Sequence, residues 1–194
     1  MDGYILDIRK KYGHLPPKKT QNSPHRNRPI DCRAKQQIVQ PADTSPSLYD
    51  KGIKRVQGIV GTLLYVGIAV NNKLLVALSK IGAQQVAATK ETAYVIEQLL
   101  DYVATYPDNS ILFRKNEMIL AAHADAGFIN KSKDRSRSGA HIFISENHPK
   151  PKLNAPVLNI AQIINYVIAS VAEAEMAALY ITAKKTRPLR RTLV

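Results

Sequence analysis

The sequence predicts an α/β protein in which a small helical segment precedes a mixed β-sheet with a packed helix. Between residues 51 and 107, apolar side chains recur at three- and four-residue spacing, which is typical of helices. From Ser110 this spacing gives way to short runs rich in β-forming residues. A final helix is indicated from Ser170 onward. Hydrophobic residues make up 45% of the 194 residues, which is enough for a packed core.

Residues 1–50 are expected to form an extended polar linker. Six of the 11 prolines fall in this segment. Proline disrupts helices and cannot donate a hydrogen bond to a sheet. Tyr4, Ile5 and Ile8 suit a short anchored element at the start of the segment.

Residues 51–107 are predicted to form three helices and to act as a helical connector. The first carries a stripe of apolar residues between Ile53 and Leu64, and Asn71-Asn72 interrupts it. The second covers 73–84. The third starts near Thr89, a residue suited to the N-cap, and Pro107 stops it. No residue in this segment points to chemistry.

Residues 110–194 are predicted to form the sheet and its helix. A β-hairpin is expected from Ile111–Arg114 and Met118–His123, and a further strand from Gly139–Ser145. A basic loop, Asn130–Ser138, lies between them. Extended structure is expected again from Val157 through Ile168.

The last helix is predicted to run from Val171 to about Lys185. Ser170 and Glu173 form an S-x-x-E capping box, a signal for a helix start. Because the residues that follow are apolar on nearly every side, this helix is expected to be largely buried. A basic stretch follows, from Lys184 to Arg191.

The charge balance favours an anionic partner. The chain has 28 Lys and Arg residues against 15 Asp and Glu, a net charge of +13. Nucleic acid is the usual partner of such a surface, and the alternatives are a solvated basic surface or a piece of a better balanced chain. Cys32 is the only cysteine, as expected for a reducing compartment, so an intracellular protein is predicted, cytoplasmic or nuclear. No apolar run approaches the ~20 residues that cross a bilayer, so no membrane partner is expected.

Two carboxylates are the candidates for a reactive site. Asp125 is expected to end an apolar strand, and Glu175 lies in an apolar part of the last helix. Buried carboxylates need donors, a cation or solvent, and two that point inward suit a hard cation such as Mg²⁺. The alternative is that Asp125 caps a turn and Glu175 pairs with a lysine or arginine.

Several sequence pieces resemble the ribonuclease H region of copia-type retrotransposon polyproteins. They are Ala124-Asp125-Ala126, then Arg135-Ser136-Arg137-Ser138-Gly139 leading into a strand, then Ser170-x-x-Glu173-Ala174-Glu175-Met176-Ala177-Ala178. The last piece is the most specific. The stretch Val56–Tyr65 resembles the segment that links polymerase to nuclease in this family, and Met1–Ile5 resembles the end of the polymerase.

The resemblance implies a ribonuclease H-like fold for 110–194, with residues 1–50 as a polymerase tail. It implies two-metal, Mg²⁺-dependent hydrolysis of the RNA strand in RNA–DNA hybrids. Asp125 and Glu175 would be the catalytic metal ligands, with Glu173 left as a capping residue. Lys131, Lys133, Arg135 and Arg137 would approach phosphates, and their alternative is an ordinary solvated loop. The implied partners are nucleic acid and the rest of the polyprotein.

The sequence also departs from the family pattern. The family's next metal ligand is an aspartate on a later strand, and no acidic residue follows Glu175. The polymerase Tyr-x-Asp-Asp motif is absent as well. The expectation is therefore an incomplete ribonuclease H-like domain with impaired activity. The alternatives are a non-catalytic, basic nucleic-acid-binding remnant and a relic without selected function.

Overall fold

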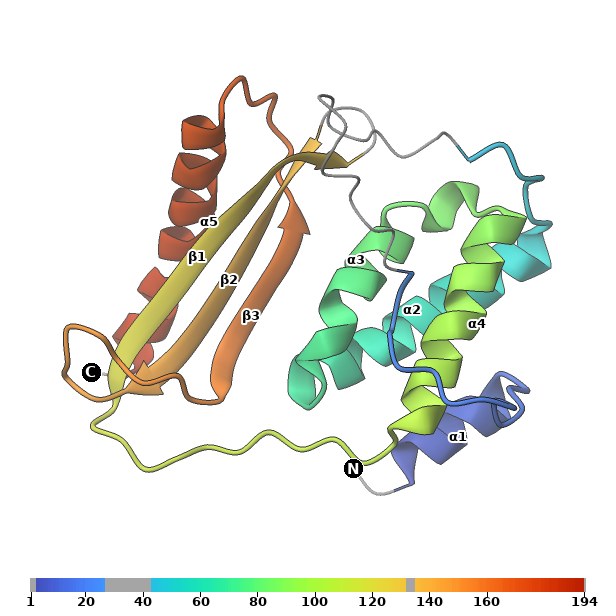
Figure 1. The fold of residues 1–194 in the computed structure, drawn as a ribbon, viewed down its shortest axis with the longest axis horizontal. Coiled ribbons are helices and arrows are strands. Elements are labelled where there is room, and N and C mark those ends of the chain that lie inside the picture. The colour runs from blue at the N-terminus through green and yellow to red at the C-terminus, as the bar shows by residue number, and fades with distance from the viewer. Residues whose placement is uncertain (1–2, 27–42, 132–134, 194) are drawn as a thin grey trace. The chain divides into compact units, whose positions relative to one another are not determined.

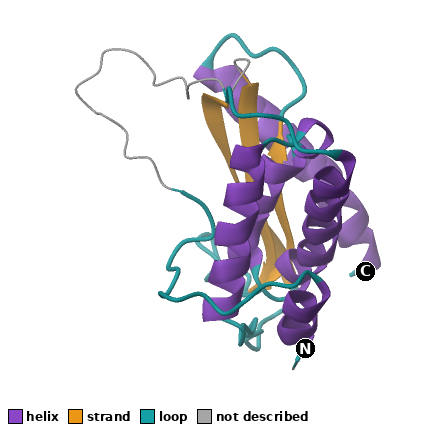
Figure 2. Ribbon diagram, turned by 90° about the vertical axis from the view of Figure 1, so that its right-hand side faces the viewer, coloured by secondary structure: helices purple, strands orange, loops and turns teal. Residues whose placement is uncertain are grey.

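The computed structural model describes residues 3–26, 43–131 and 135–193, which fall into two compact units. Unit 1 consists of the described residues up to 110, and unit 2 of those from 111 onward. Among the described residues, unit 1 is built on helices, and all three strands belong to unit 2 (Figure 2). This division confirms an α/β chain with a helical part ahead of a sheet.

Unit 1 contains the three helices expected between residues 51 and 107. They are α2 (Asp50–Ala69), α3 (Leu75–Gly82) and α4 (Lys90–Thr105), and short 3₁₀ turns lie at Asn72–Leu74 and Gln85–Ala87 (Figure 1). The buried residues of α2 are Val56, Ile59, Val60, Leu63, Val66 and Gly67, which follow helical spacing. A Cβ at Gly67 would lie 3.2 Å from side-chain atoms of Leu75 and Leu78. The glycine therefore allows α2 and α3 to pack closely.

The ends of α4 are set by the residues that the sequence singles out. The Thr89 side chain accepts a hydrogen bond from the Thr92 backbone N–H at 3.2 Å, and the Thr92 hydroxyl accepts one from the Thr89 N–H at 3.2 Å. The helix ends at Thr105, two residues before Pro107, whose ring disfavours helical backbone in the residue that precedes it. The predicted N-cap of this helix is confirmed.

The segment expected to be an extended linker begins with a helix, α1 (Tyr4–Lys11). Ile5 and Ile8 are buried in the core of unit 1, so their apolar surface is removed from water. The Tyr4 ring packs edge-on against Tyr65 of α2, with ring centroids 5.9 Å apart. The hydrophobic effect therefore anchors this end of the chain on the helices of unit 1. The polar composition of residues 1–50 as a whole did not predict this helix.

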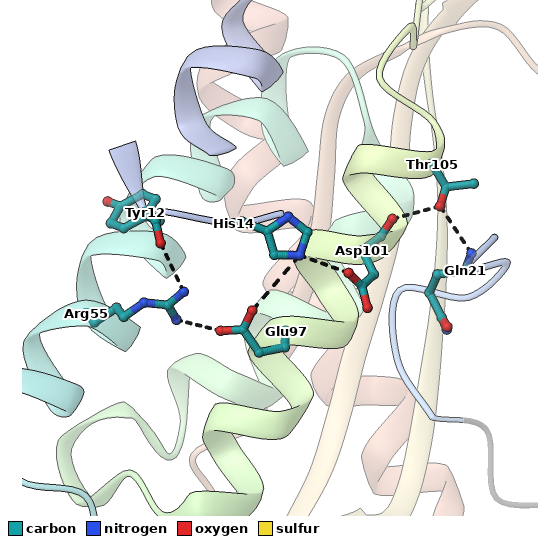
Figure 3. Close-up of polar contacts among 7 residues, drawn as sticks. All are labelled: Tyr12, His14, Gln21, Arg55, Glu97, Asp101 and Thr105. Atoms are coloured by element: carbon teal, nitrogen blue, oxygen red, sulfur yellow. Dashed lines mark hydrogen bonds and ion pairs between the residues drawn. The ribbon is translucent and has the colours of Figure 1, made fainter. Parts of the chain in front are cut away.

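Polar contacts hold the residues after α1 along α4 (Figure 3). The His14 Nε2 atom lies 2.8 Å from Asp101 Oδ1 and 4.0 Å from Glu97 Oε2, and only 5% of the His14 side chain is exposed. Arg55 of α2 donates to Glu97 at 2.7 Å and to the Tyr12 carbonyl at 3.2 Å. Because α4 presents both carboxylates on one side, a single helix face fixes this segment.

Unit 2 contains an antiparallel sheet of order β1-β2-β3, formed by β1 (Ile119–Lys131), β2 (Arg135–Ser145) and β3 (Pro156–Ile163). Its strand pairs are all antiparallel over the described residues, whereas the sequence predicted a mixed sheet. The hairpin predicted from Ile111 to His123 is wrong, because 111–118 contains no strand and β1 pairs with β2. Met118, at φ 62°, interrupts the extended backbone there. The extended run predicted through Ile168 ends at Ile163.

The helix α5 (Val171–Thr192) covers one face of this sheet, over β1 and β2 (Figure 1). Ala126 and Phe128 of β1 pack against a cluster of Ile164, Ile168 and Ala174. The Ser170 hydroxyl caps α5 by accepting from the Glu173 N–H at 3.2 Å, while the Glu173 carboxylate accepts from the Ala169 N–H at 2.8 Å. The expected helix start is thus confirmed, and the Glu173 carboxylate bonds to Ala169, the residue before the N-cap.

The expectation that this helix is largely buried is wrong. Only Ala174, Ala178 and Thr182 are buried, because a single sheet face covers one side of α5. Met176 and Tyr180, on the other side, are 69% and 63% exposed. Apolar composition alone does not show how many faces of a helix pack against other elements.

Candidate functional site

The sequence predicted that Asp125 ends a strand, but the structure places it inside β1. Its Cα partner in β2 is Gly139, and the strand continues to Lys131. Because side chains alternate between the faces of a strand, Asp125 lies on the face opposite to Ala126, which packs toward α5. His123 shares that outer face and contacts Phe143 edge-on, with ring centroids 5.3 Å apart. The Asp125 side chain is exposed.

Glu175 lies in the first turns of α5 and is also exposed. It follows Ala174, which is buried against the sheet. Successive residues of a helix are rotated by about 100°, so Glu175 lies on a flank of α5. Neither Glu175 nor Asp125 makes an ion pair or a side-chain hydrogen bond within the described part of the chain.

The structure thus brings β1 and α5 together without gathering the two carboxylates in a cavity. The sheet separates the face that carries Asp125 from the face that α5 covers. Mg²⁺ demands near-octahedral oxygen coordination, so two carboxylates would hold it only together with further oxygen ligands. Among the described residues, no group of three or more His, Cys, Asp or Glu side chains is placed to hold a metal ion.

The expected basic loop is shorter than Asn130–Ser138, because both strands extend into it. The backbones of Lys131 and Arg135 belong to β1 and β2, and their side chains lie outside the described part. Lys133 also lies outside the described residues. Ser136 and Ser138 are buried because β2 is the central strand, with a neighbour on each side.

Arg137 lies on the central strand and is only 8% exposed. Its guanidinium donates to the Ala161 carbonyl of β3 at 3.4 Å. Burial lowers the pKa of Arg137 below its usual value, because a charged group loses hydration in the interior. A buried guanidinium that is held against a neighbouring strand is poorly placed to reach a nucleic-acid backbone.

Five exposed cations of unit 2 gather instead at the end of α5. Lys184, Lys185, Arg187, Arg190 and Arg191 are all exposed. Lys184, Arg187 and Arg191 follow at i, i+3 and i+7 and form one stripe along the helix, here called the α5 stripe. At 1.5 Å per residue the stripe is about 10 Å long, which matches about three phosphates at 3.4 Å per step of one duplex strand.

A second group of cations was not singled out by the sequence. Arg114, Lys115 and Lys152 line one cavity of unit 2, between the segment before β1 and the loop after β2. Lys152 lies almost forty positions after Arg114 and Lys115 in the sequence. The basic character of each segment was therefore the signal that the sequence offered. Asn154, whose side chain ties the two segments together, offered no signal of its own.

Comparisons with known protein families, curated proteins and solved structures found no match. Within the described residues, no helix is both long enough and apolar enough to cross a membrane.

Proposed function

We propose that the chain is part of a copia-type retrotransposon polyprotein, and that unit 2 is the opening of a ribonuclease H-like domain that binds nucleic-acid backbones. The order of elements supports the family assignment. Three antiparallel strands are followed by a helix that packs over the first two and starts directly after its N-cap, Ser170, in the order that the resemblance implies. Asp125 lies in the first of these strands and Glu175 in the helix.

The α5 stripe is the observation that carries the binding function. Its three cations are exposed, and none of them forms an ion pair with a carboxylate among the described residues. Such a surface binds phosphates without reading bases, and binding releases counterions. The proposed ligand is therefore an RNA–DNA hybrid or another nucleic acid, bound in a salt-dependent and sequence-independent manner.

Mg²⁺-dependent hydrolysis of the RNA strand of a hybrid is the second candidate function. It is favoured by one specific observation. Asp125 and Glu175 are exposed carboxylates without protein partners among the described residues, and they lie on two elements that pack together. The separation of these carboxylates by the sheet favours binding over hydrolysis. Catalysis would need further acidic ligands from the rest of the polyprotein.

One set of measurements separates the two functions. A labelled RNA–DNA hybrid is titrated with the 194-residue chain at several salt concentrations, and the same mixtures are assayed for RNA cleavage with Mg²⁺. Binding that weakens with salt, without cleavage, supports the first function. Cleavage that is lost in Asp125→Asn and in Glu175→Gln would instead establish the second. Absence of hybrid binding at low salt would refute both.

The polyprotein origin has its own test. The genomic sequence on both sides of the coding region can be read for an in-frame continuation. A continuation that carries an aspartate on a further strand supports the family assignment. Flanking sequence that encodes an unrelated domain would contradict it.

A further inference from the structure

Two segments of unit 2 enclose a half-open cavity of about 240 Å³. One segment precedes β1 and contributes Arg114, Lys115 and Asn116. The other is the end of β2 and the loop that follows it, with Glu146, Lys152 and Asn154. A water molecule takes about 30 Å³ in the liquid, so the cavity has room for a small polyatomic ion with water.

The Asn154 side chain joins the two segments through their backbones. Its Oδ1 atom accepts from the Arg114 N–H at 2.9 Å, and its Nδ2 atom donates to the Arg114 carbonyl at 3.0 Å and to the Ile144 carbonyl at 3.0 Å. The backbone of Arg114 is thereby fixed, while its guanidinium remains exposed. A cation held on a fixed backbone loses less conformational entropy on binding a ligand than one on a free loop.

Other hydrogen bonds fix the remaining walls in the same way. The Ser145 hydroxyl donates to the Lys152 carbonyl at 2.7 Å, and the Asn116 amide donates to the Arg114 carbonyl at 2.8 Å. Glu117 accepts from the Asn147 N–H at 2.7 Å. The neutral polar side chains are thus engaged with backbone groups, so the cationic side chains are left to meet a ligand.

The charge around the cavity is positive and mostly unpaired. Within the described part of the chain, Arg114 and Lys115 have no carboxylate partner. Lys152 has one, Glu146, at 3.7 Å, but the two side chains are 82% and 45% exposed. Exposed ion pairs contribute little and exchange partners readily. Three cations against one carboxylate favour an anion and exclude a metal cation.

We propose that Arg114, Lys115 and Lys152 form a binding site for a phosphate group. The planar guanidinium of Arg114 can donate two hydrogen bonds to phosphate oxygens, and the lysines add point charges from both segments. Among the residues that the structure describes, no aromatic side chain lines the cavity for a base to stack on, so the site is expected to recognise the phosphate and not a nucleobase. The phosphate comes either from a nucleic-acid backbone or from a free phosphate, and this site does not depend on the α5 stripe.

Inorganic phosphate provides the first test. Titration of the ¹⁵N-labelled full chain is expected to give saturable NMR shifts of the Asn116 and Asn154 side-chain amides. The double variant Arg114→Gln/Lys115→Gln is expected to weaken binding at least about tenfold, because two charge-assisted contacts are lost. The matched control, Lys51→Gln/Lys54→Gln, removes the same charge from exposed positions of α2 and is expected to bind as the wild type does.

Two results would overturn the site. Either the amides do not shift with phosphate, or both double variants weaken the shifts equally, in which case phosphate responds to net charge. Both substitutions leave the backbone hydrogen bonds of Arg114 in place, so folding should be retained. If the double variant does not fold, Lys152→Gln replaces it and is expected to weaken phosphate binding by itself.

An RNA–DNA hybrid then identifies the source of the phosphate. A loss of hybrid affinity in Arg114→Gln/Lys115→Gln, with a salt slope that falls by about one per lost contact, assigns the site to the nucleic-acid backbone. Unchanged hybrid affinity, together with weakened binding of inorganic phosphate, assigns it to a free phosphate. Phosphate binding without any hybrid binding would refute the proposed nucleic-acid function and leave this site intact.

Discussion

The α5 stripe should account for a measurable part of the salt dependence of nucleic-acid binding. Three neutralised duplex phosphates give a slope of log affinity against log salt of roughly −2.7, at about −0.9 per phosphate. Between 50 and 200 mM salt, this contribution alone lowers affinity by about 40-fold. Replacing Lys184, Arg187 and Arg191 with glutamine should therefore flatten the slope by about 2.7 and weaken binding most at low salt.

Fluorescence anisotropy of a labelled RNA–DNA hybrid measures both quantities. Glutamine has a helix propensity close to that of lysine and arginine, so α5 should be retained, and circular dichroism checks this. The control replaces three exposed lysines of unit 1 with glutamine, which gives the same change in net charge. These residues are Lys51, Lys54 and Lys73. An equal flattening in the control would show that net charge, and not the stripe, governs binding.

Three further predictions concern stability. Leu63→Ala, at a residue with 0% exposure, should lower the free energy of unfolding measured in urea by about 2–5 kcal/mol. The control Leu64→Ala, at a residue with 42% exposure, should lower it far less. Equal losses in the two variants would contradict the packing of α2. Hydrogen bonds from Ser45 and Thr89 lower the pKa of Asp43, so the stability that its charged form contributes should be present above about pH 4 and disappear as the pH falls through the lowered pKa. The free energy of unfolding of Asp43→Asn should therefore differ from that of the wild type only on the neutral side of the pH profile. A difference that stays constant with pH would show that the charge of Asp43 is not its cause. Pro188 lacks the N–H that would donate to the Lys184 carbonyl within α5. Pro188→Ala should therefore slow hydrogen exchange of the backbone amides in the last turns of the helix. Unchanged exchange would show that this end of the helix is frayed with either residue.

Local signals account for the parts of the fold that the sequence predicted well. The start of α4 at Thr89 and the start of α5 at Ser170 depend on a hydroxyl that bonds to a backbone N–H three residues away. The buried stripe of α2 depends on spacing within one helix. Such features require only neighbouring residues, so a sequence pattern is sufficient to predict them.

The predictions that failed depended on partners distant in the sequence. The run from Ile111 to Arg114 has β-forming residues, but Asn154 binds the backbone of Arg114 and no strand forms there. Arg137 was expected in an open loop, yet β3 pairs beside it and buries it. In each case a segment more than twenty residues away determined the outcome, and no local pattern encodes that choice.

The sequence alone specified the helices after residue 50, the apolar runs that form the three strands, the capping residues and an excess of positive charge, because each of these follows from residue type and short-range spacing. Only the folded chain established the strand register, and with it the face on which Asp125 lies relative to α5. A shift of one residue along a strand reverses the side-chain direction, so the relation between Asp125 and Glu175 depends on pairing across the sheet. The same holds for Arg114, Lys115 and Lys152, which become neighbours only when two loops close on Asn154.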